Sequence, residues 1–402
     1  MSMPLEGFRI LDMTVWQQGP VATAMLADMG AKVIKIEERT KGDPGRQIKI
    51  NWPWEDDDFP ISFYFEGNNR NKKSLALDLK TPGGKKIFYR LVERSDAFVS
   101  NFRRAALDRL ELDYPTLRQR NAKIIYAVAS GYGPKGPYTD RPCNDFAGLA
   151  LGGLLSQVRD GPPIAFSGGI ADQSAAFILA YGVVVALLAR ERTGLGQEVN
   201  TSLLGSQIAL GANTLQGYLM TGKFPIDHTA TKPLHPFWSV YQTKDKRWLC
   251  LAFLEPHRYW HDACDALGFK ELEEDPRFDT EKKRSRANSG VLIEMVKEAI
   301  AQKTLEEWTA ILDQKDFVWA PVRGYDEVAS DPQAIANGYI VDFNHPVIGA
   351  TKLAGIPVQL SETPGKVRSA APQLGEHSEE VLSQICHYSP EEISRFKAEK
   401  VI

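Results

Sequence analysis

The N-terminal half of the chain alternates short apolar runs with segments of helical periodicity. The runs predicted as strands are FRILDMT, KVIKIE, KSLALDL, AFVSNF and KIIYAVASG, with helices between them that include GPVATAMLADMG. Pro20 suits the first turn of that helix and Gly30 suits its C-terminal end. Strands that alternate with helices in this way predict an α/β fold with a doubly wound parallel sheet.

The longest apolar stretch, Ala175 to Ala189, falls short of the ~20 residues that a bilayer-spanning helix needs. It also contains Tyr181 and Gly182. We therefore expect a buried core helix and no membrane partner.

The pattern changes after about Gly205, at the end of a large domain predicted over residues 1–205. Residues 206–224 are predicted to be a linker, because TLQGYLMTGKFPIDHTATKPLHPFWS resembles a long loop. The next stretch, VYQTKDKRWLCLAF, alternates like a β-hairpin, and three helical segments follow it. Residues 225–325 are therefore predicted to form a smaller α+β domain.

Charge and cysteine content narrow the class of protein. The 402 residues carry a formal net charge of -3, which gives a nucleic-acid partner no electrostatic support. The 4 cysteines form no C-x-x-C pair, and MSMPLEGFRILDMT lacks the basic and apolar regions of a signal peptide. We expect a reducing, cytoplasmic setting. His257 and His261 have a spacing that zinc can use, but no third ligand is evident, so no metal site is predicted.

One motif and one missing motif argue against a dinucleotide-dependent enzyme and a serine hydrolase. GYGPKGPY matches G-x-G-x-x-G, but Pro134 and Pro137 interrupt the helix that a dinucleotide-binding turn requires. A turn that brings the backbone close to a ligand is the better interpretation. No serine lies in a G-x-S-x-G elbow, so a hydrolase triad is unsupported.

Basic residues gather where the predicted strands end. Arg103, Arg104 and Arg109 follow one strand, Lys80 follows another, and Arg39 and Arg46 follow a third. Ligands of open parallel sheets bind at this edge, so these residues are either a solvated basic face or a site for a phosphorylated ligand.

Asp172 stands just before the long apolar stretch, after Gly168 and Gly169. It is predicted to act as the N-cap of a helix, and the helix N-terminus would hold its carboxylate ionised. An ionised, fixed carboxylate is also what a nucleophile that attacks thioesters needs. The local sequence leaves both roles open.

Several linked segments resemble one family over nearly the whole chain, the class III CoA-transferases, which include formyl-CoA:oxalate and carnitine CoA-transferases. The segments that carry the resemblance, in order, are PLEGFRILDMT, QGPVATAMLADMGAKVIKIE, NKKSLALDLKTPGG, NFRRAALDRL, GYGPKGPY, ERTGLGQEVNTSLL and PQLGEHSEEVL. The resemblance implies a Rossmann-like large domain that residues 326–402 return to complete, and an interlocked homodimer.

The resemblance also implies a covalent mechanism. Asp172 matches the family's catalytic aspartate, with Ala171 where a glycine is usual. It would transfer CoA from an acyl-CoA to a carboxylic acid through aspartyl anhydrides and an aspartyl-CoA thioester. Gly168 and Gly169 are candidate oxyanion donors. No permanently bound cofactor is implied, since coenzyme A enters as part of the substrate.

Ligand contacts carry over from the family position by position. The positions that match CoA contacts are Leu77, Lys80, Asn101, Phe102, Ala106 and Arg109. A further arginine of the family falls on Glu38, so Arg39 is taken as its substitute. The expected acyl-pocket residues are Gln17, Tyr64, Asn144 and Asp145.

Two alternatives remain. An α-methylacyl-CoA racemase of the same fold carries a His-Asp pair where this chain has Asn144 and Asp145, and asparagine does not exchange protons at neutral pH. A CoA-binding subunit of a mixed-chain transferase would not need Asp172.

The acid substrates are predicted from two local features. Aromatic residues cluster near the N-terminus, and they either line a wide apolar pocket or pack in the core: Trp16, Trp52, Trp54, Phe63 and Tyr64. The stretch TATKPLHPFWSVY lacks the glycines of the mobile loop in oxalate-type enzymes. Both features disfavour oxalate.

Overall fold

The computed structural model describes residues 2–49, 59–156, 168–223 and 235–402. Contacts within the chain divide it into two compact units. The large unit comprises Met1–Leu154, Ala165–Ala212 and Pro332–Ile402, and the small unit comprises Leu155–Ile164 and Asn213–Asp331.

The large unit is built on a six-stranded sheet in which every neighbouring pair of strands is parallel. Its order is β3-β2-β1-β4-β5-β6. The strands are β1 (Arg9–Met13), β2 (Lys32–Glu37), β3 (Lys72–Ala76), β4 (Ala97–Ser100), β5 (Ile125–Ser130) and β6 (Glu198–Ser202). The predicted doubly wound sheet is confirmed. The strand order reverses between β1 and β4, and such a switch point opens a crevice at the carboxyl ends of the two strands.

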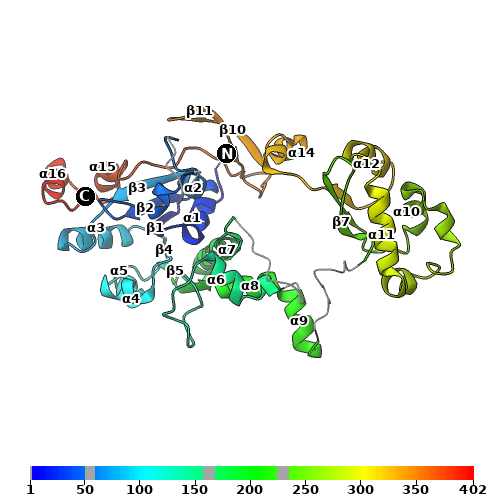
Figure 1. Cartoon of the computed structure of the whole chain (residues 1–402). Coiled ribbons are helices and arrows are strands. Elements are labelled where there is room, and N and C mark those ends of the chain that lie inside the picture. Colours follow the sequence, from blue (N-terminus) through cyan, green and yellow to red (C-terminus); the bar gives the residue numbers. More distant parts are fainter. Residues whose placement is uncertain (1, 50–58, 157–167, 224–234) are drawn as a thin grey trace. The chain divides into compact units, whose positions relative to one another are not determined.

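Helices cover both faces of this sheet (Figure 1). Alternate residues of one strand point to opposite faces, so Leu11 belongs to one buried cluster and Ile10 to the other. The first cluster packs under α3 (Pro82–Val92), α5 (Tyr114–Arg120) and the C-terminal segment. The second packs under α1 (Gln18–Asp28) and α7 (Ile170–Thr193). As predicted, Pro20 lies in the first turn of α1, and Gly30 follows the helix with φ +105°.

The helix α7 is apolar both on the side that faces the core and on the opposite side. Leu179, Val183 and Leu187 are buried beneath it. Its other side exposes large apolar side chains, namely Phe177, Tyr181, Val184, Val185 and Leu188. The expectation of a buried core helix therefore holds for one face only. Within one copy of the chain, the sheet and α1 pack against that face, and the opposite face stays exposed. By length and composition alone, α7 is apolar enough to cross a membrane.

The C-terminal segment returns to the large unit. Residues around α15 (Ser378–Glu380) and α16 (Pro390–Ala398) pack into the cluster beneath α3, and the backbone N–H of Asp78 donates to the carbonyl of Val401 over 2.8 Å. Near this return lies an antiparallel hairpin of β10 (Ile340–His345) and β11 (Gly349–Ala354), which was not predicted. The short helix α14 (Pro332–Ala336) precedes it.

The small unit has an antiparallel sheet of β7 (Trp238–Gln242), β8 (Trp248–Ala252) and β9 (Trp319–Pro321). The hairpin expected in VYQTKDKRWLCLAF is confirmed, with Gln242 opposite Trp248. The helices α10 (Trp260–Leu267), α11 (Ser289–Ile300) and α12 (Leu305–Leu312) share a core with the sheet, and α13 (Tyr325–Val328) follows them.

The segment 206–224, predicted to be a linker, is helical for most of its length. It contains the end of α8 (Leu203–Leu210) and the whole of α9 (Ala212–Thr221). Leucine, glutamine and methionine favour helix strongly enough to outweigh the single Gly217. Residues 224–234 lie outside the described part of the chain.

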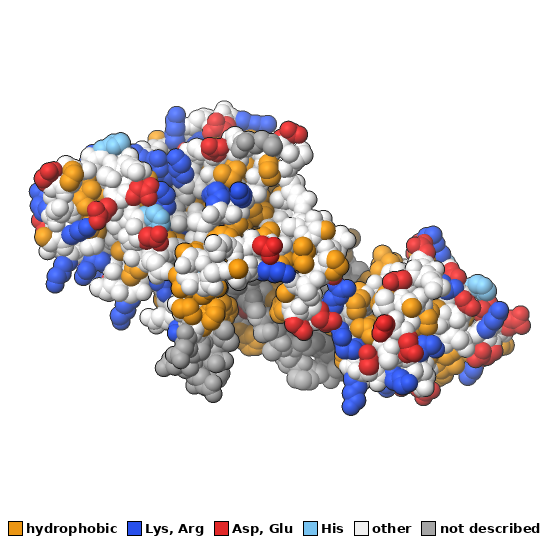
Figure 2. Space-filling view, turned by 90° about the horizontal axis from the view of Figure 1, so that it is seen from above, with side chains coloured by type: hydrophobic (Ala, Val, Ile, Leu, Met, Phe, Trp, Pro, Cys, Tyr) orange, Lys and Arg blue, Asp and Glu red, His pale blue; other side chains and the backbone are white. Residues whose placement is uncertain are grey.

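Charges of both signs are mixed over the visible face of each unit (Figure 2). This agrees with the small net charge of -3.

Candidate active site

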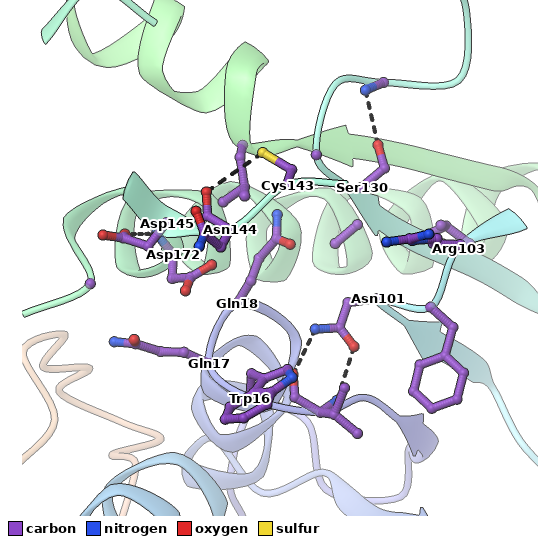
Figure 3. Close-up of a pocket in the computed structure, with 18 of the residues that line it drawn as sticks. Trp16, Gln17, Gln18, Asn101, Arg103, Ser130, Cys143, Asn144, Asp145 and Asp172 are labelled. Carbon is purple, nitrogen blue, oxygen red and sulfur yellow. Dashed lines mark hydrogen bonds between the residues drawn. The ribbon is translucent and has the colours of Figure 1, made fainter. Parts of the chain in front are cut away.

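A cavity of about 670 Å³ opens in the large unit at the carboxyl ends of β1, β4 and β5. This is the switch point of the sheet, where ligands of such folds bind. Its lining includes the turn before α1, the segment after β4, the start of α6 (Asp145–Leu151) and the start of α7. Figure 3 shows these segments around the opening.

Asp172 lies in the first turn of α7 and lines this cavity. The predicted N-cap role is wrong, because the cap position is taken by Gly169, whose φ of 72° and ψ of 42° are left-handed. The Asp172 carboxylate, three residues after the cap position, makes no capping hydrogen bond. The Asp172 carboxyl group instead points toward the side of the cavity that holds Gln17 and Gln18 (Figure 3).

The pKa of Asp172 is raised, whereas the helix N-terminus was expected to favour its anion. Its backbone N–H donates to Oδ1 of Asp145 over 3.0 Å, so a second carboxyl group stands beside it. Burial, and then the negative charge of Asp145, raise the pKa of Asp172 to about 7. These two effects outweigh the helix N-terminus, which favours the anion. An anion that is poorly solvated is a more reactive nucleophile than an exposed one.

Gln17 and Gly169 meet at the edge of the cavity nearest Asp172. Gln17 is 9% exposed. A Cβ atom added at Gly169 would lie 2.2 Å from Oε1 of Gln17 and 2.5 Å from its Nε2. The absent side chain of Gly169 therefore makes room for the Gln17 amide.

Two other polar groups of the cavity stay protonated. Burial, followed by the charge of Asp172, raises the pKa of Tyr64, so its hydroxyl remains a hydrogen-bond donor. Burial likewise raises the pKa of the Cys143 thiol. Since the thiolate is the reactive form of cysteine, the Cys143 thiol is a weak nucleophile in this cavity.

Nine of the predicted site residues line the cavity. They are Gln17, Tyr64, Asn101, Phe102, Asn144, Asp145, Gly168, Gly169 and Asp172. Asn144 also caps α6, because its side chain accepts from the backbone N–H of Ala147 over 3.1 Å. Asn101 also has a structural role, because its side-chain amide accepts a hydrogen bond from the N–H of Val15 and donates one to the carbonyl of Val15.

The other five predicted contacts do not line the cavity: Arg39, Leu77, Lys80, Ala106 and Arg109. Leu77 is 2% exposed and belongs to the core, and its backbone N–H donates to the carbonyl of Glu37 over 2.9 Å. Lys80 and Arg109 are exposed, and Arg109 ends the short helix α4 (Arg104–Arg109). Arg46 is paired with Glu37 over 2.7 Å, so its charge is already used within the protein.

Some lining residues were not singled out from the sequence. Ser130, the last residue of β5, and Arg141 and Cys143, which follow the strand, contribute to the cavity. The signal was present in GYGPKGPY: Gly131 and Gly133 line the cavity as the expected close-approach turn, and no helix begins before Asp145. Of the aromatic cluster, Trp16 and Tyr64 line the cavity and Phe63 does not, while Trp52 and Trp54 lie outside the described residues.

Within the described ranges, no group of three or more His, Cys, Asp or Glu residues is placed to hold a metal ion. The side chains that line the cavity include carboxyl, amide and hydroxyl groups and the guanidinium groups of Arg103, Arg104 and Arg141.

A comparison with family models decides the class of protein. Residues 5–378 match the model of CoA-transferase family III. The chain belongs to this family.

Known members of the family align with almost the whole transferase. The (R)-2-hydroxy-4-methylpentanoate CoA-transferase of Clostridioides difficile is 30% identical over 406 residues and covers 100% of both chains. The formyl-CoA:oxalate CoA-transferase of Streptomyces avermitilis is 32% identical and also covers 100% of both. A solved CAIB/BAIF family protein from Brucella suis is 28% identical, with a TM-score of 0.84 over 96% of this chain and 100% of its own. The protein is a class III CoA-transferase.

The pH dependence of this transferase should report the carboxyl pair. With the pKa of Asp172 at about 7, kcat/KM for an acyl-CoA is expected to rise through about pH 7 as the anion forms. Asp145→Asn removes a negative neighbour but keeps an oxygen for the Asp172 N–H, so the midpoint should fall by about one pH unit. Asp140→Asn removes an exposed charge nearby and is the control. A midpoint that stays in place in Asp145→Asn would show that the two carboxyl groups are not coupled.

Proposed function

We propose that this transferase moves CoA from an acyl-CoA to a free carboxylic acid by covalent catalysis at Asp172. The observation that carries the proposal is the position of Asp172: a half-buried carboxyl group at the switch point of the sheet, inside the cavity and beside Asp145. A carboxylate in such a place can form an acyl anhydride that bulk water reaches poorly.

The first half-reaction has two steps. A carboxylate oxygen of Asp172 attacks the thioester carbonyl of the donor, the C–S bond breaks, and an aspartyl mixed anhydride and CoA thiolate are formed. The thiolate then attacks the aspartyl carbonyl, which releases the donor acid as a carboxylate and leaves an aspartyl-CoA thioester. The acceptor carboxylate reverses this order in the second half-reaction, which regenerates Asp172 and forms the new acyl-CoA.

Each of these steps passes through an oxyanion, which needs hydrogen-bond donors. We assign this role to the backbone N–H groups of Gly168 and Gly169, which donate no hydrogen bond to another described residue. The protonated hydroxyl of Tyr64 is a third donor in the same cavity.

The CoA contacts remain a proposal based on the family positions. Lys80 and Arg109 are exposed cations near the carboxyl edge of the sheet, which suits phosphate contacts. Such contacts bind substrate and transition state alike, so Lys80→Ala and Arg109→Ala should raise KM more than they lower kcat. Arg118, on α5, lies outside the predicted set, and Arg118→Ala serves as the control.

The shape of the cavity supports larger acids. Large apolar side chains contribute to its wall: Trp16, Ile48, Tyr64, Phe146 and Leu203. Burial of apolar surface contributes about 25 cal/mol per Å², and a two-carbon acid has almost none to bury. We propose branched or aromatic acids, or succinate as CoA donor, in preference to oxalate or formate.

A panel of acyl-CoA donors and free acids, with the CoA esters separated by chromatography, tests the proposed function. CoA exchange by the chain alone is the expected result, and it rules out a role limited to a mixed-chain subunit. Preference for oxalate would contradict the pocket argument. The alternative is tested in deuterated water. If the α-carbon of a 2-methylacyl-CoA gains deuterium and no CoA is exchanged, the protein is a racemase and the proposed transfer is wrong.

We propose a homodimer in which a second copy covers the exposed apolar side of α7. Tyr181 is 70% exposed and Leu188 is 60% exposed there, and apolar patches of this kind mark interaction sites. Light scattering should give twice the chain mass of 44.8 kDa. A monomer that binds lipid vesicles instead would assign this side of α7 to a membrane.

A further inference from the structure

The turn between β1 and α1 places Trp16 and Gln17 in the cavity, and its backbone is strained. Trp16 has a φ of 65°, in the left-handed region that bulky residues rarely occupy. Its side chain is 44% exposed and lines the cavity next to Gln17. Such a conformation persists only when the surrounding structure imposes it.

Every backbone N–H and carbonyl group of Thr14, Val15 and Trp16 forms a hydrogen bond with a side chain. Asp12 accepts from the N–H of Thr14 over 3.1 Å, and Nζ of Lys35 donates to its carbonyl over 2.9 Å. Asn101 holds both groups of Val15, at 2.9 and 2.7 Å (Figure 3). The N–H of Trp16 donates to Oδ1 of Asp43 over 3.1 Å. The carbonyl of Trp16 accepts from Asn68 over 3.4 Å.

The two ionised members of this set that come from outside β1 pair with each other. Nζ of Lys35 lies 2.9 Å from Oδ2 of Asp43, and their side chains are 0% and 1% exposed. Burial disfavours the Lys35 cation, but Asp12, Asp43 and Glu37 outweigh it and raise the pKa of Lys35. One ion pair thus bonds the turn at two points, the Thr14 carbonyl and the Trp16 N–H.

A buried ion pair is costly to desolvate and is weak evidence for stability by itself. Here its hydrogen bonds reach the one residue of the turn with left-handed backbone, and the next residue, Gln17, packs against Gly169 beside the nucleophile. We infer that Lys35 and Asp43 are positioning residues that hold Trp16 in its left-handed conformation, so that Gln17 is oriented toward Gly169 and the reacting group. The inference rests on the proposed function only for the reaction used as its assay.

The test is a double-mutant cycle between Asp43 and Trp16. Asp43→Asn keeps the size and one acceptor oxygen but removes the ion pair, and kcat should fall about 10- to 100-fold with KM for acyl-CoA within about threefold. Glycine adopts a positive φ without help. In a Trp16→Gly background, Asp43→Asn should therefore lower kcat by less than about a third of the fold-change that it causes in the parent enzyme. Equal losses in both backgrounds would overturn the inference, and so would a normal kcat in Asp43→Asn.

The matched control is Asp28→Asn. Asp28 forms a similarly buried pair with Arg70 at 2.7 Å, at the other end of α1. We expect this variant to lower the melting temperature while kcat stays within about threefold. If Asp28→Asn lowers kcat as much as Asp43→Asn does, the effect is general loss of structure and the inference fails.

Hydrogen exchange on the unaltered enzyme provides a readout that needs neither a folded variant nor a known reaction. The amide of Trp16 should exchange as slowly as amides of the central strands, because Asp43 holds it. Exchange at the rate of an open loop would overturn the inference even if CoA transfer is confirmed. Slow exchange without CoA transfer would instead place the failure in the proposed function.

Discussion

Asp172→Asn is expected to lower kcat for CoA transfer by about a thousandfold or more, with CoA affinity nearly unchanged. The amide keeps the shape of the side chain but cannot form an anhydride, and loss of a covalent nucleophile typically has an effect of this order. Steady-state kinetics and calorimetric titration with CoA measure the two quantities. Enzyme treated with acyl-CoA and hydroxylamine should carry a hydroxamate at Asp172, found by mass spectrometry of peptides.

The control for this prediction is Asp145→Asn, which changes the neighbouring carboxyl group in the same cavity. It should still form the hydroxamate at Asp172, with an altered pH dependence. If Asp172→Ala retains more than a few per cent of the activity, covalent catalysis at Asp172 is ruled out.

Gly169→Ala is expected to lower kcat about 10- to 100-fold in a folded enzyme. The new methyl group would lie 2.2 Å from Oε1 of Gln17, so the amide has to move, and a displacement of about 1 Å near reacting atoms can have an effect of this size. Circular dichroism and thermal melting establish that the fold is intact.

Gly194→Ala is the matched control, because Gly194, at the C-terminal end of α7, has the same φ of 72° as Gly169, but an added Cβ there meets nothing within 4 Å. Both variants incur backbone strain, while only Gly169→Ala displaces Gln17. Gly194→Ala should stay within about threefold of the parent kcat. In a Gln17→Ala background, Gly169→Ala should add little further loss. Equal effects of the two glycine variants would assign the loss to strain in the backbone.

The sequence determined the parallel sheet and its windings, because strand and helix periodicity is local. Runs such as KVIKIE can be buried on both sides, and helical segments of the right length connect them. Since ligands of such sheets bind at the carboxyl ends of strands, Arg103 and Arg104 could be placed near the site from their position after a strand, and both line the cavity. Gln17, Asn101 and Phe102 were predicted from the family resemblance, and they line it too. The linked family segments supplied Asp172 and the class of reaction.

Local signals gave a wrong secondary structure where helix-favouring and loop-favouring residues are mixed over a few positions. The segment ANTLQGYLMT contains a glycine and polar residues, and it was predicted as part of a linker although it forms α9. The hairpin of β10 and β11 was not predicted. Pairings of this kind depend on partner strands and on packing, which local propensity does not encode.

Tertiary structure alone decided the ionisation of the site. From the sequence, Asp172 was expected to be a helix cap held as an anion. In the fold, Gly169 caps α7, and Asp145, 27 residues away along the chain, brings a second carboxyl group to the backbone of Asp172. Burial and this neighbour raise the pKa to about 7. Lys35, Asp43 and Asn101 likewise meet at the turn of Trp16 only after three strands have assembled. Electrostatic energies depend on distance and burial, and both are properties of the folded chain that no local pattern of residues contains.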